Sequence, residues 1–254
     1  MMGSMQSKVV IVTGASLGIG KATSLMLAEA GAHVVMIARN AEKLRLLQEQ
    51  IEAKGGSVES HALDVGEAEA LDAQITEIAQ RHGRLDGLVN NASSYTYGQI
   101  VDASNDEWRE AFRGGAEAVF VATRAALRVM IPQASGSIVN VSSTNGLRAM
   151  PGLATYSTSK AAIIHFSAVA AIEAAHASVR VNAVAPGIIE TPHTQDFLND
   201  QEARAGVESK VPMLRSGRAE EIAAPIVFLL SDAATYITGA CLPIDGGKAA
   251  QLFA

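Results

Sequence analysis

The chain has 254 residues, of which 48% are apolar, 18% charged and only 4% aromatic, which suits one large α/β domain with an ample core. Its formal net charge of −6 argues against a nucleic-acid partner, because neutralising phosphates requires clustered Lys and Arg. No apolar run is long enough to span a bilayer and no signal segment opens the chain, so we expect no membrane partner.

The two ends of the chain give simple expectations. Residues 1–7 are interpreted as a disordered leader or a remnant of cloning, and residues 8–254 as a single domain. The one cysteine, Cys241, cannot form an internal disulfide, which favours a reducing, cytoplasmic compartment. Because it lies in an apolar stretch, we expect it to act as a small buried hydrophobe.

From residue 8 onward, short β-branched runs alternate with longer helical patterns, which is typical of repeated βαβ units. The predicted strands cover residues 8–13, 33–38, 57–63, 85–90, 137–142, 179–184 and 240–244. The predicted helices cover residues 21–30, 41–54, 67–81, 104–130, 156–175 and 219–230. This order predicts an α/β fold: a single Rossmann-like, doubly wound domain with a seven-stranded parallel sheet flanked by helices.

Residues 188–215 fit this alternation least well. They are polar, contain Pro192 and Pro212, and separate the sixth predicted strand from the next helix. Connections of that length in a compact domain are usually lids or binding loops. We therefore expect a substrate-covering loop near 188–215 with some helix of its own.

A glycine-rich turn follows the first predicted strand and opens the first predicted helix. Its sequence is Thr13-Gly14-Ala15-Ser16-Leu17-Gly18-Ile19-Gly20. Glycines allow a tight turn and let the backbone approach a pyrophosphate, which the helix N-terminus then binds. With a strand before it and a helix after it, the turn predicts a dinucleotide site. The residues expected to contact the cofactor there are Gly14, Ser16, Gly18, Ile19 and Gly20.

The spacing G-x-x-x-G-x-G resembles the first turn of the short-chain dehydrogenase/reductase family, T-G-x-x-x-G-x-G. The resemblance extends from about Lys8 to Gly247, because further family features recur in order. They are Asp64-Val65, Asn90-Asn91-Ala92, Ser143, Tyr156 with Lys160, Pro186-Gly187 and Asp245-Gly246-Gly247. The resemblance implies a nicotinamide-dependent oxidoreductase.

The end of the second predicted strand bears on which nicotinamide cofactor is used. A carboxylate there binds the ribose 2′-hydroxyl of NAD, whereas an arginine pairs with the 2′-phosphate of NADP. This chain has Ala38 where NAD-preferring relatives are acidic, followed by Arg39, so we expect NADP, with NAD second. The alternative is that Arg39 is a solvated loop charge. Leu17 weakens the NADP prediction, because many NADP-preferring relatives have a basic residue within the turn.

Tyr156 and Lys160 are four residues apart, so they share one face of a helix. The Lys160 ammonium can then lower the pKa of the Tyr156 phenol from about 10 toward the working pH, which suits an acid that protonates an oxygen during hydride transfer. Ser143 follows the fifth predicted strand, and its hydroxyl is expected to bind the substrate oxygen. Ser142 is the competitor, but alternation turns it to the other face of the sheet. This set resembles the catalytic residues of the family.

Further roles are implied by the resemblance alone. Asp64 and Val65 would hold the adenine, and Asn91 and Ala92 would line the middle of the cofactor. Tyr156 and Lys160 also belong to the cofactor site, with Lys160 holding the nicotinamide ribose. The residues that would contact the carboxamide are Pro186, Gly187, Ile189 and Thr191.

Two positions depart from the family pattern. Ser93 replaces the glycine that usually follows Asn-Asn-Ala. Its side chain either narrows the space beneath the cofactor, or the serine must adopt a positive φ. Gly115, preceded by Gly114, stands where the family has an asparagine that supports a water leading to the lysine. Two glycines inside a helix cost about 1 kcal/mol each and indicate close packing or a kink. The six histidines show no metal-ligand spacing, so no metal is expected.

The leading hypothesis is reversible hydride transfer between NADP(H) and a small carbonyl or alcohol substrate, with Tyr156 as general acid/base. The alternative is a cofactor-binding protein of the same fold with impaired catalysis, acting as a sensor or scaffold; Gly115 and Ser93 favour it. An epimerase or dehydratase is a third reading, because a fold does not fix chemistry. The resemblance implies a homotetramer.

Overall fold

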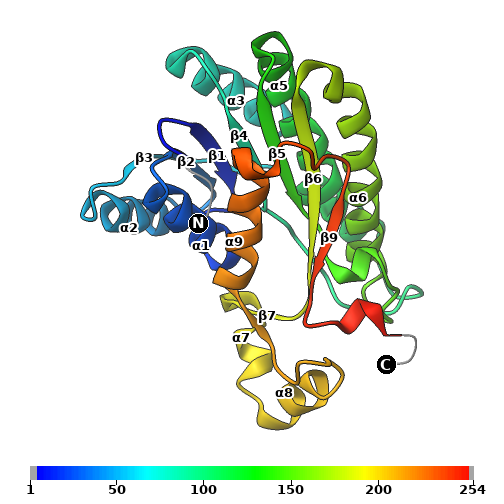
Figure 1. Cartoon of the computed structure of the whole chain (residues 1–254). Helices are drawn as coiled ribbons and strands as arrows, with labels where there is room; N and C mark the ends of the chain where they lie inside the picture. The colour runs from blue at the N-terminus through cyan, green and yellow to red at the C-terminus, as the bar shows by residue number, and fades with distance from the viewer. Residues whose placement is uncertain (1–4, 252–254) are drawn as a thin grey trace.

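Seven β-branched runs pair into one parallel sheet in the order β3-β2-β1-β4-β5-β6-β9 (Figure 1). The computed structural model describes residues 5–251. The strands are β1 (Val9–Thr13), β2 (His33–Ala38), β3 (Ser57–Ala62), β4 (Gly87–Asn90), β5 (Gly136–Val141), β6 (Val179–Pro186) and β9 (Cys241–Ile244). The predicted Rossmann-like α/β fold with a seven-stranded parallel sheet is confirmed.

Helices cover both faces of the sheet, which is why its central strands are almost continuously apolar (Figure 1). On one face, apolar side chains of the sheet pack against α1 (Gly18–Glu29), α2 (Ala41–Glu52) and α9 (Ala219–Leu230). On the other face they pack against α3 (Ala68–His82), α5 (Ala118–Gln133) and α6 (Ala154–Ala174).

The strand order reverses between β1 and β4, which creates a crevice at the carboxyl edge of the sheet. In open α/β sheets, ligands bind in this crevice outside the strand ends. The glycine turn follows β1, Asn91 follows β4, Ser143 comes two residues after β5, and Gly187 follows β6. The topology therefore gathers residues that are far apart in the sequence at one edge.

Residues 188–215 do contain helix of their own, as expected. They include β7 (Ile189–Glu190), α7 (Pro192–Leu198) and α8 (Gln201–Glu208), and β7 pairs with β8 (Gly217–Arg218) just beyond them. In Figure 1 this segment projects past the carboxyl ends of the strands. It is therefore placed at the same edge as the crevice.

Two expectations need correction. The helix predicted over 104–130 is divided into α4 (Asn105–Phe112) and α5 by a π-helical turn at Arg113–Glu117, which contains the paired glycines. Residues 1–7 are not all a disordered leader: Met5 is fully buried because its apolar side chain fills the core beside α1, and its N–H donates to the Ala30 carbonyl. Residues 1–4 of that leader lie outside the described residues.

Within residues 5–251, no helix combines the length and apolar character needed to cross a membrane.

Candidate active site

The glycine turn has a backbone that only glycine accommodates. Gly14 and Gly18 have φ values of +63° and +52°, a region that residues with a Cβ rarely adopt. A Cβ on Gly20 would lie 2.3 Å from the Gly14 carbonyl oxygen. Leu17 precedes α1 and provides no side-chain cap, so the first N–H groups of this helix are left to other acceptors. The turn thus fits an anionic group at a helix N-terminus.

Asn91 and Ala92 support this turn from β4. The Asn91 side-chain amide donates to the carbonyls of Thr13 and Gly14, each at 3.1 Å. The Thr13 hydroxyl accepts from the N–H groups of Asn91 at 3.0 Å and Ala92 at 3.2 Å. These contacts show how the two residues hold the shape of the turn at the point where the family resemblance places the middle of the cofactor.

Arg39 lies just past the end of β2, exposed, and its side chain has no hydrogen bond or ion pair among residues 5–251. The Ala15 N–H donates to the Ile37 carbonyl, which ties the glycine turn to this strand end. Of the two residues expected near the adenine, Val65 is buried, and the Asp64 carboxylate accepts from the Gly66 N–H at 2.9 Å. The Arg39 guanidinium, which has no carboxylate partner among residues 5–251, is therefore available for an anion.

The structure brings Ser143, Tyr156 and Lys160 together, as predicted. Ser143 follows β5, while Tyr156 and Lys160 lie on the same face of α6. The Ser143 hydroxyl accepts from the Asn145 N–H at 3.1 Å and interacts with the Tyr156 phenol, and the Lys160 Nζ lies 5.6 Å from the centre of the Tyr156 ring. The Ser142 hydroxyl instead donates to the Lys160 carbonyl at 2.8 Å, so it is already engaged. The geometry therefore agrees with the choice of Ser143 over Ser142.

Burial controls the protonation of this cluster. Burial raises the pKa of Tyr156, and the hydrogen bond from Ser143 only partly opposes that rise. Burial also lowers the pKa of Lys160 to about 8. The Lys160 Nζ donates to the Val141 carbonyl at 2.8 Å. In this structure burial therefore raises the pKa of Tyr156, where we expected a net fall, and Tyr156 keeps its proton at neutral pH.

The buried lysine gives a prediction for stability. The folded Lys160 loses its proton above about pH 8, whereas the unfolded side chain keeps it to about 10.5. Between these values the unfolded state binds more protons, so the free energy of unfolding rises with pH. Between pH 7 and 11, the free energy of unfolding should rise by about 3 kcal/mol more in the parent protein than in the Lys160→Met variant. Urea denaturation without cofactor measures both. If the free energy of unfolding depends on pH in the same way in both proteins, the lowered pKa of Lys160 is contradicted.

Sequence reasoning missed Tyr95, which lies beside this cluster. Its ring meets the Tyr156 ring edge-on, with 5.9 Å between centroids, and it is 55% exposed. The Thr96 hydroxyl is 3.2 Å from the Thr155 hydroxyl, which connects the same loop to the start of α6. The only sequence signal was an aromatic residue shortly after β4. Tyr95 is placed to form an aromatic wall for a bound substrate.

Ser159 accounts for Gly115, the second glycine of the π-helical turn. Its hydroxyl accepts from the Ala116 N–H at 3.1 Å, and a Cβ on Gly115 would lie 2.3 Å from this same oxygen. Gly115 therefore reflects close packing of the turn against α6, one of the two expected explanations. The other departure, Ser93, is exposed and does not adopt a positive φ, so it introduces no backbone strain.

The residues expected near the carboxamide lie at the end of β6 and at the start of the 188–215 segment. Pro186 ends β6, and the Gly187 N–H donates to the Ile244 carbonyl at 3.0 Å. Ile189 is buried in β7. Thr191 precedes α7, and a Cβ placed on Gly18 would lie 3.1 Å from its methyl group. The segment therefore meets the glycine turn.

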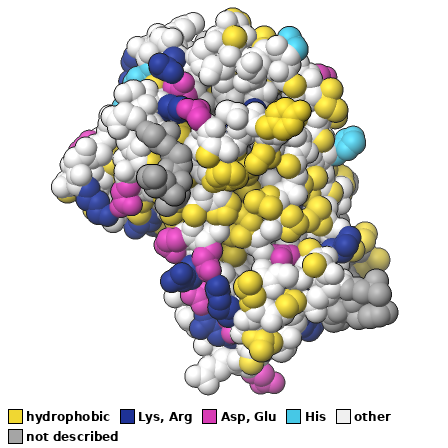
Figure 2. All heavy atoms as spheres, viewed as in Figure 1, with side chains coloured by type: hydrophobic (Ala, Val, Ile, Leu, Met, Phe, Trp, Pro, Cys, Tyr) yellow, Lys and Arg dark blue, Asp and Glu magenta, His cyan; other side chains and the backbone are white. Residues whose placement is uncertain are grey.

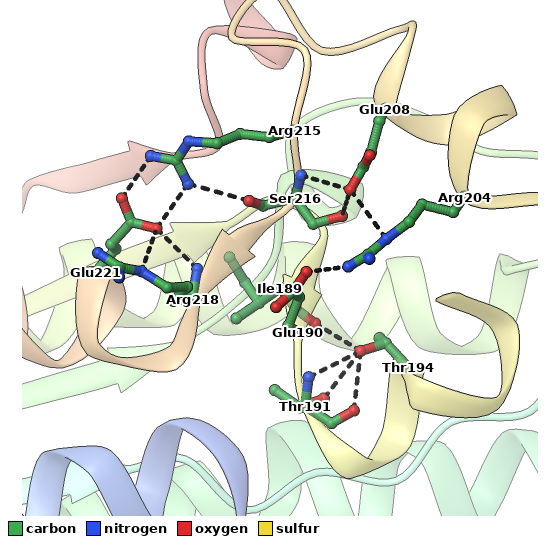
Figure 3. Close-up of polar contacts among 10 residues, drawn as sticks. All are labelled: Ile189, Glu190, Thr191, Thr194, Arg204, Glu208, Arg215, Ser216, Arg218 and Glu221. Atoms are coloured by element: carbon green, nitrogen blue, oxygen red, sulfur yellow. Dashed lines mark hydrogen bonds and ion pairs between the residues drawn. The ribbon is translucent and has the colours of Figure 1, made fainter. Parts of the chain in front are cut away.

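Polar contacts hold the segment in place (Figure 3). Arg204 on α8 pairs with Glu190 on β7 and lies 3.3 Å from Glu208. Glu208 also accepts from the N–H of Ser216 at 3.0 Å and from its hydroxyl at 2.8 Å. Exposed ion pairs contribute little individually, about 0–1 kcal/mol each. Together these contacts tie α8 to β7 and to the residue before β8.

A cavity of about 710 Å³ lies between this segment, β9 and α9. Ile188, Met213 and Ile222 give it an apolar lining, and Arg215, which pairs with Glu221 at 2.6 Å, forms part of its rim. Ser143, Tyr156 and Lys160 do not line it. Leu147 and Arg148, which directly follow the turn that Ser143 caps, also line it.

Comparisons with known proteins define the class. Residues 14–249 match the family model described as Enoyl-(Acyl carrier protein) reductase. The chain is 39% identical to a 3-oxoacyl-[acyl-carrier-protein] reductase FabG from Thermotoga maritima, covering 96% of this chain and 98% of that protein. It is 36% identical to a cyclopentanol dehydrogenase from Comamonas sp., covering 98% of this chain and all of that one.

Solved structures agree with these sequence matches. A putative short-chain alcohol dehydrogenase from Sinorhizobium meliloti superimposes with a TM-score of 0.94 at 35% identity, over 99% of this chain and 100% of that one. A putative NAD(P) dependent gluconate 5-dehydrogenase from Beutenbergia cavernae, with bound NADP, gives 0.94 at 33% identity, over 98% and 99%. The fold and the matches define an oxidoreductase with a nicotinamide cofactor. The chain belongs to the short-chain dehydrogenase/reductase family.

Proposed function

We propose that the protein transfers a hydride between NADP(H) and a small carbonyl or alcohol substrate, with Tyr156 as the general acid/base. The observation that carries this proposal is the convergence of Ser143, Tyr156 and Lys160 at the carboxyl edge of the sheet, the edge that also carries the glycine turn. A buried phenol that keeps its proton at neutral pH is the form needed to reduce a carbonyl.

Each side chain has a separate task in this proposal. When bound, the reduced nicotinamide supplies the hydride. The Tyr156 phenol gives its proton to the substrate oxygen as negative charge develops there, and the Ser143 hydroxyl donates a hydrogen bond to the same oxygen. The protonated Lys160 favours the phenolate that results, because an opposite charge nearby stabilises an anion.

The residues present fit an NADP molecule. The glycine turn is a cradle that any added Cβ would fill, and it supplies Gly14, Ser16, Gly18, Ile19 and Gly20 for the phosphates. The remaining residues that would hold the cofactor are Arg39, Asp64, Val65, Asn91, Ala92, Tyr156, Lys160, Pro186, Gly187, Ile189 and Thr191. All of them lie along the carboxyl edge of the sheet.

Arg39 supports NADP over NAD. Its guanidinium is exposed and has no partner among residues 5–251, and charge-assisted hydrogen bonds to a phosphate stabilise by about 1.5–3 kcal/mol. Arg39→Glu should therefore raise the KM for NADPH about 10- to 100-fold and leave the KM for NADH unchanged or lower, in steady-state assays with either cofactor. The matched control is Lys54→Glu, an equal charge change beyond the other end of α2. Equal effects of the two substitutions would contradict a specific role for Arg39.

The experiment that tests the function is NADPH oxidation, with NADH in parallel, across a panel of ketones and aldehydes. The panel should contain a 3-oxoacyl thioester and cyclopentanone, because the relatives named above act on such groups. Turnover with NADPH supports the proposal. Turnover with NADH alone overturns the NADP assignment.

A second candidate function is a cofactor-binding protein with impaired catalysis, acting as a sensor or scaffold. Gly115 favours it, because no amide side chain extends from the π-helical turn toward Lys160. This reading predicts NADPH binding by fluorescence titration without turnover of any member of the panel. Measurable turnover that Tyr156→Phe abolishes would exclude it.

We further propose a homotetramer acting in the cytoplasm. Exposed apolar side chains gather over β9 and the neighbouring helices α9 and α6 in Figure 2. They include Ile172 (80% exposed), Val169, Phe228, Tyr236 and Leu242. Apolar patches on an exposed edge strand and its flanking helices are typical of subunit contacts. Sedimentation of the purified protein measures how many chains assemble.

The proposed cytoplasmic location is supported by the unpaired Cys241, which is consistent with a reducing compartment.

A further inference from the structure

Three histidines and a glutamate meet at the amino edge of the sheet, opposite the candidate active site. His33 begins β2, Glu59 and His61 lie on β3, and His82 ends α3. In the β2–β3 register, His33 pairs with Ser57 and Val35 with Glu59, so the side chains of His33 and Glu59 share the face that α3 covers. The residues come from three elements, which explains why the sequence spacing predicted no metal site.

The nitrogen of His33 that faces this cluster has no partner. Its Nδ1 lies 2.7 Å from the Ser57 hydroxyl, whereas its Nε2 is buried and has no hydrogen bond in the described structure. The Glu59 carboxylate is 4.0 Å from this Nε2, too far for a hydrogen bond. A hydroxyl on one ring nitrogen fixes the orientation of the other, which is the usual arrangement around a metal-binding histidine.

The remaining distances match those of a metal site. The Glu59 Oε1 lies 3.3 Å from the His82 Nε2 and 3.4 Å from the His61 Nε2. The ligand atoms of His33, Glu59 and His82 all lie within 4.8 Å of one another. Bonds of about 2.1 Å in a tetrahedral zinc site place ligand atoms about 3.4 Å apart. Small side-chain movements would therefore bring these ligand atoms to bonding distance of one ion.

The electrostatic surroundings favour a cation. The C-terminus of α3 ends at His82 and directs the negative end of its dipole at the cluster. Arg81 opposes this, because its guanidinium donates to both Glu59 oxygens at 2.7 Å. The Oε2 atom of Glu59, whose one hydrogen bond is to Arg81, nevertheless keeps a second lone-pair direction for a metal.

We propose that His33, Glu59 and His82 form a binding site for a first-row divalent cation, zinc being the best match to two imidazoles and a carboxylate. A water would complete the coordination, and His61 positions the Glu59 carboxylate. The site joins the edge strand β3 and the start of β2 to the end of α3. It lies at the other end of the sheet from Tyr156, so it stabilises the fold and takes no part in hydride transfer.

The test is calorimetric titration of ZnCl2 into tag-free, EDTA-treated protein, with Co2+ absorption spectra to report tetrahedral coordination. We expect one ion per chain, with binding weakened at least about tenfold by His33→Ala and by His82→Ala. Arg81→Ala should tighten binding several-fold, because it removes a competing positive charge. The matched control is His165→Ala, which changes an exposed histidine on α6 and should leave binding unaltered.

Several results would overturn the proposal. They are the absence of stoichiometric zinc binding, or binding that survives both His33→Ala and His82→Ala, or binding that His165→Ala weakens equally. Thermal melts in EDTA establish that each variant is folded before titration, and His82→Asn provides a second, less disruptive change. In the unsubstituted protein, zinc should raise the melting temperature, and in His33→Ala it should not.

Discussion

Replacing Tyr156 by phenylalanine is expected to lower kcat by about 100- to 10,000-fold while leaving the Kd for NADPH nearly unchanged. The substitution removes the phenolic proton that the proposal assigns to the substrate oxygen, and it retains the ring that packs against Tyr95. Because burial keeps the phenol protonated, the loss should be present across neutral pH. Steady-state NADPH oxidation and fluorescence titration of NADPH measure the two quantities.

The matched control for this prediction is Tyr95→Phe. Tyr95 is the aromatic neighbour of Tyr156, so it is the other phenol that a substrate in this crevice would meet. If Tyr156 is the acid, removing the Tyr95 hydroxyl should change kcat by no more than a few-fold. A larger loss from Tyr95→Phe than from Tyr156→Phe would reverse the assignment.

The central strands of the sheet could be predicted because they are buried on both faces. The run at β1, Val9–Thr13, is fully buried, and this burial is what makes it read as a continuous apolar strand in the sequence. Met5 was misjudged because a single apolar residue in a short flanking stretch gives no periodicity, although it fills the core beside α1. A sequence pattern therefore indicates burial only where several neighbouring residues are buried together.

The candidate site was predictable where its geometry is local. Tyr156 and Lys160 share a helix face by spacing alone, and alternation along β5 separates Ser142 from Ser143. The protonation of the cluster was not predictable in this way. The hydrogen bond from Lys160 to the Val141 carbonyl crosses from α6 to β5, and burial decides the direction of the Tyr156 pKa.

Residues that meet only through tertiary structure were beyond the reach of spacing arguments. His33, Glu59 and His82 come from two strands and a helix, and nothing in their sequence separation indicates a shared site. Gly115 and Ser159 likewise meet only in the folded structure. The sequence indicated close packing or a kink at the glycine, but the partner that requires it is on α6.

Gly115→Asn is expected to lower the free energy of unfolding by about 1–3 kcal/mol, as overpacking of a tight contact does. The added Cβ would lie 2.3 Å from the Ser159 hydroxyl oxygen, so this hydroxyl must leave its hydrogen bond with the Ala116 N–H. Urea denaturation measures the loss. The matched control is Gly206→Asn, a helical glycine of α8 with no atom within 4 Å of an added Cβ, where a change within about 0.5 kcal/mol is expected.

The double variant Gly115→Asn with Ser159→Ala separates two accounts of this glycine. If Ser159 fills the space that an asparagine would occupy, removing its hydroxyl should recover part of the lost stability, with a coupling above about 0.5 kcal/mol. Gly115 is then one half of a repacked pair, and the serine on α6 is the reason that the turn has no side chain there. If Gly115→Asn is instead as stable as the parent and raises kcat, the glycine is a defect in the site. That outcome would favour the reading of impaired catalysis.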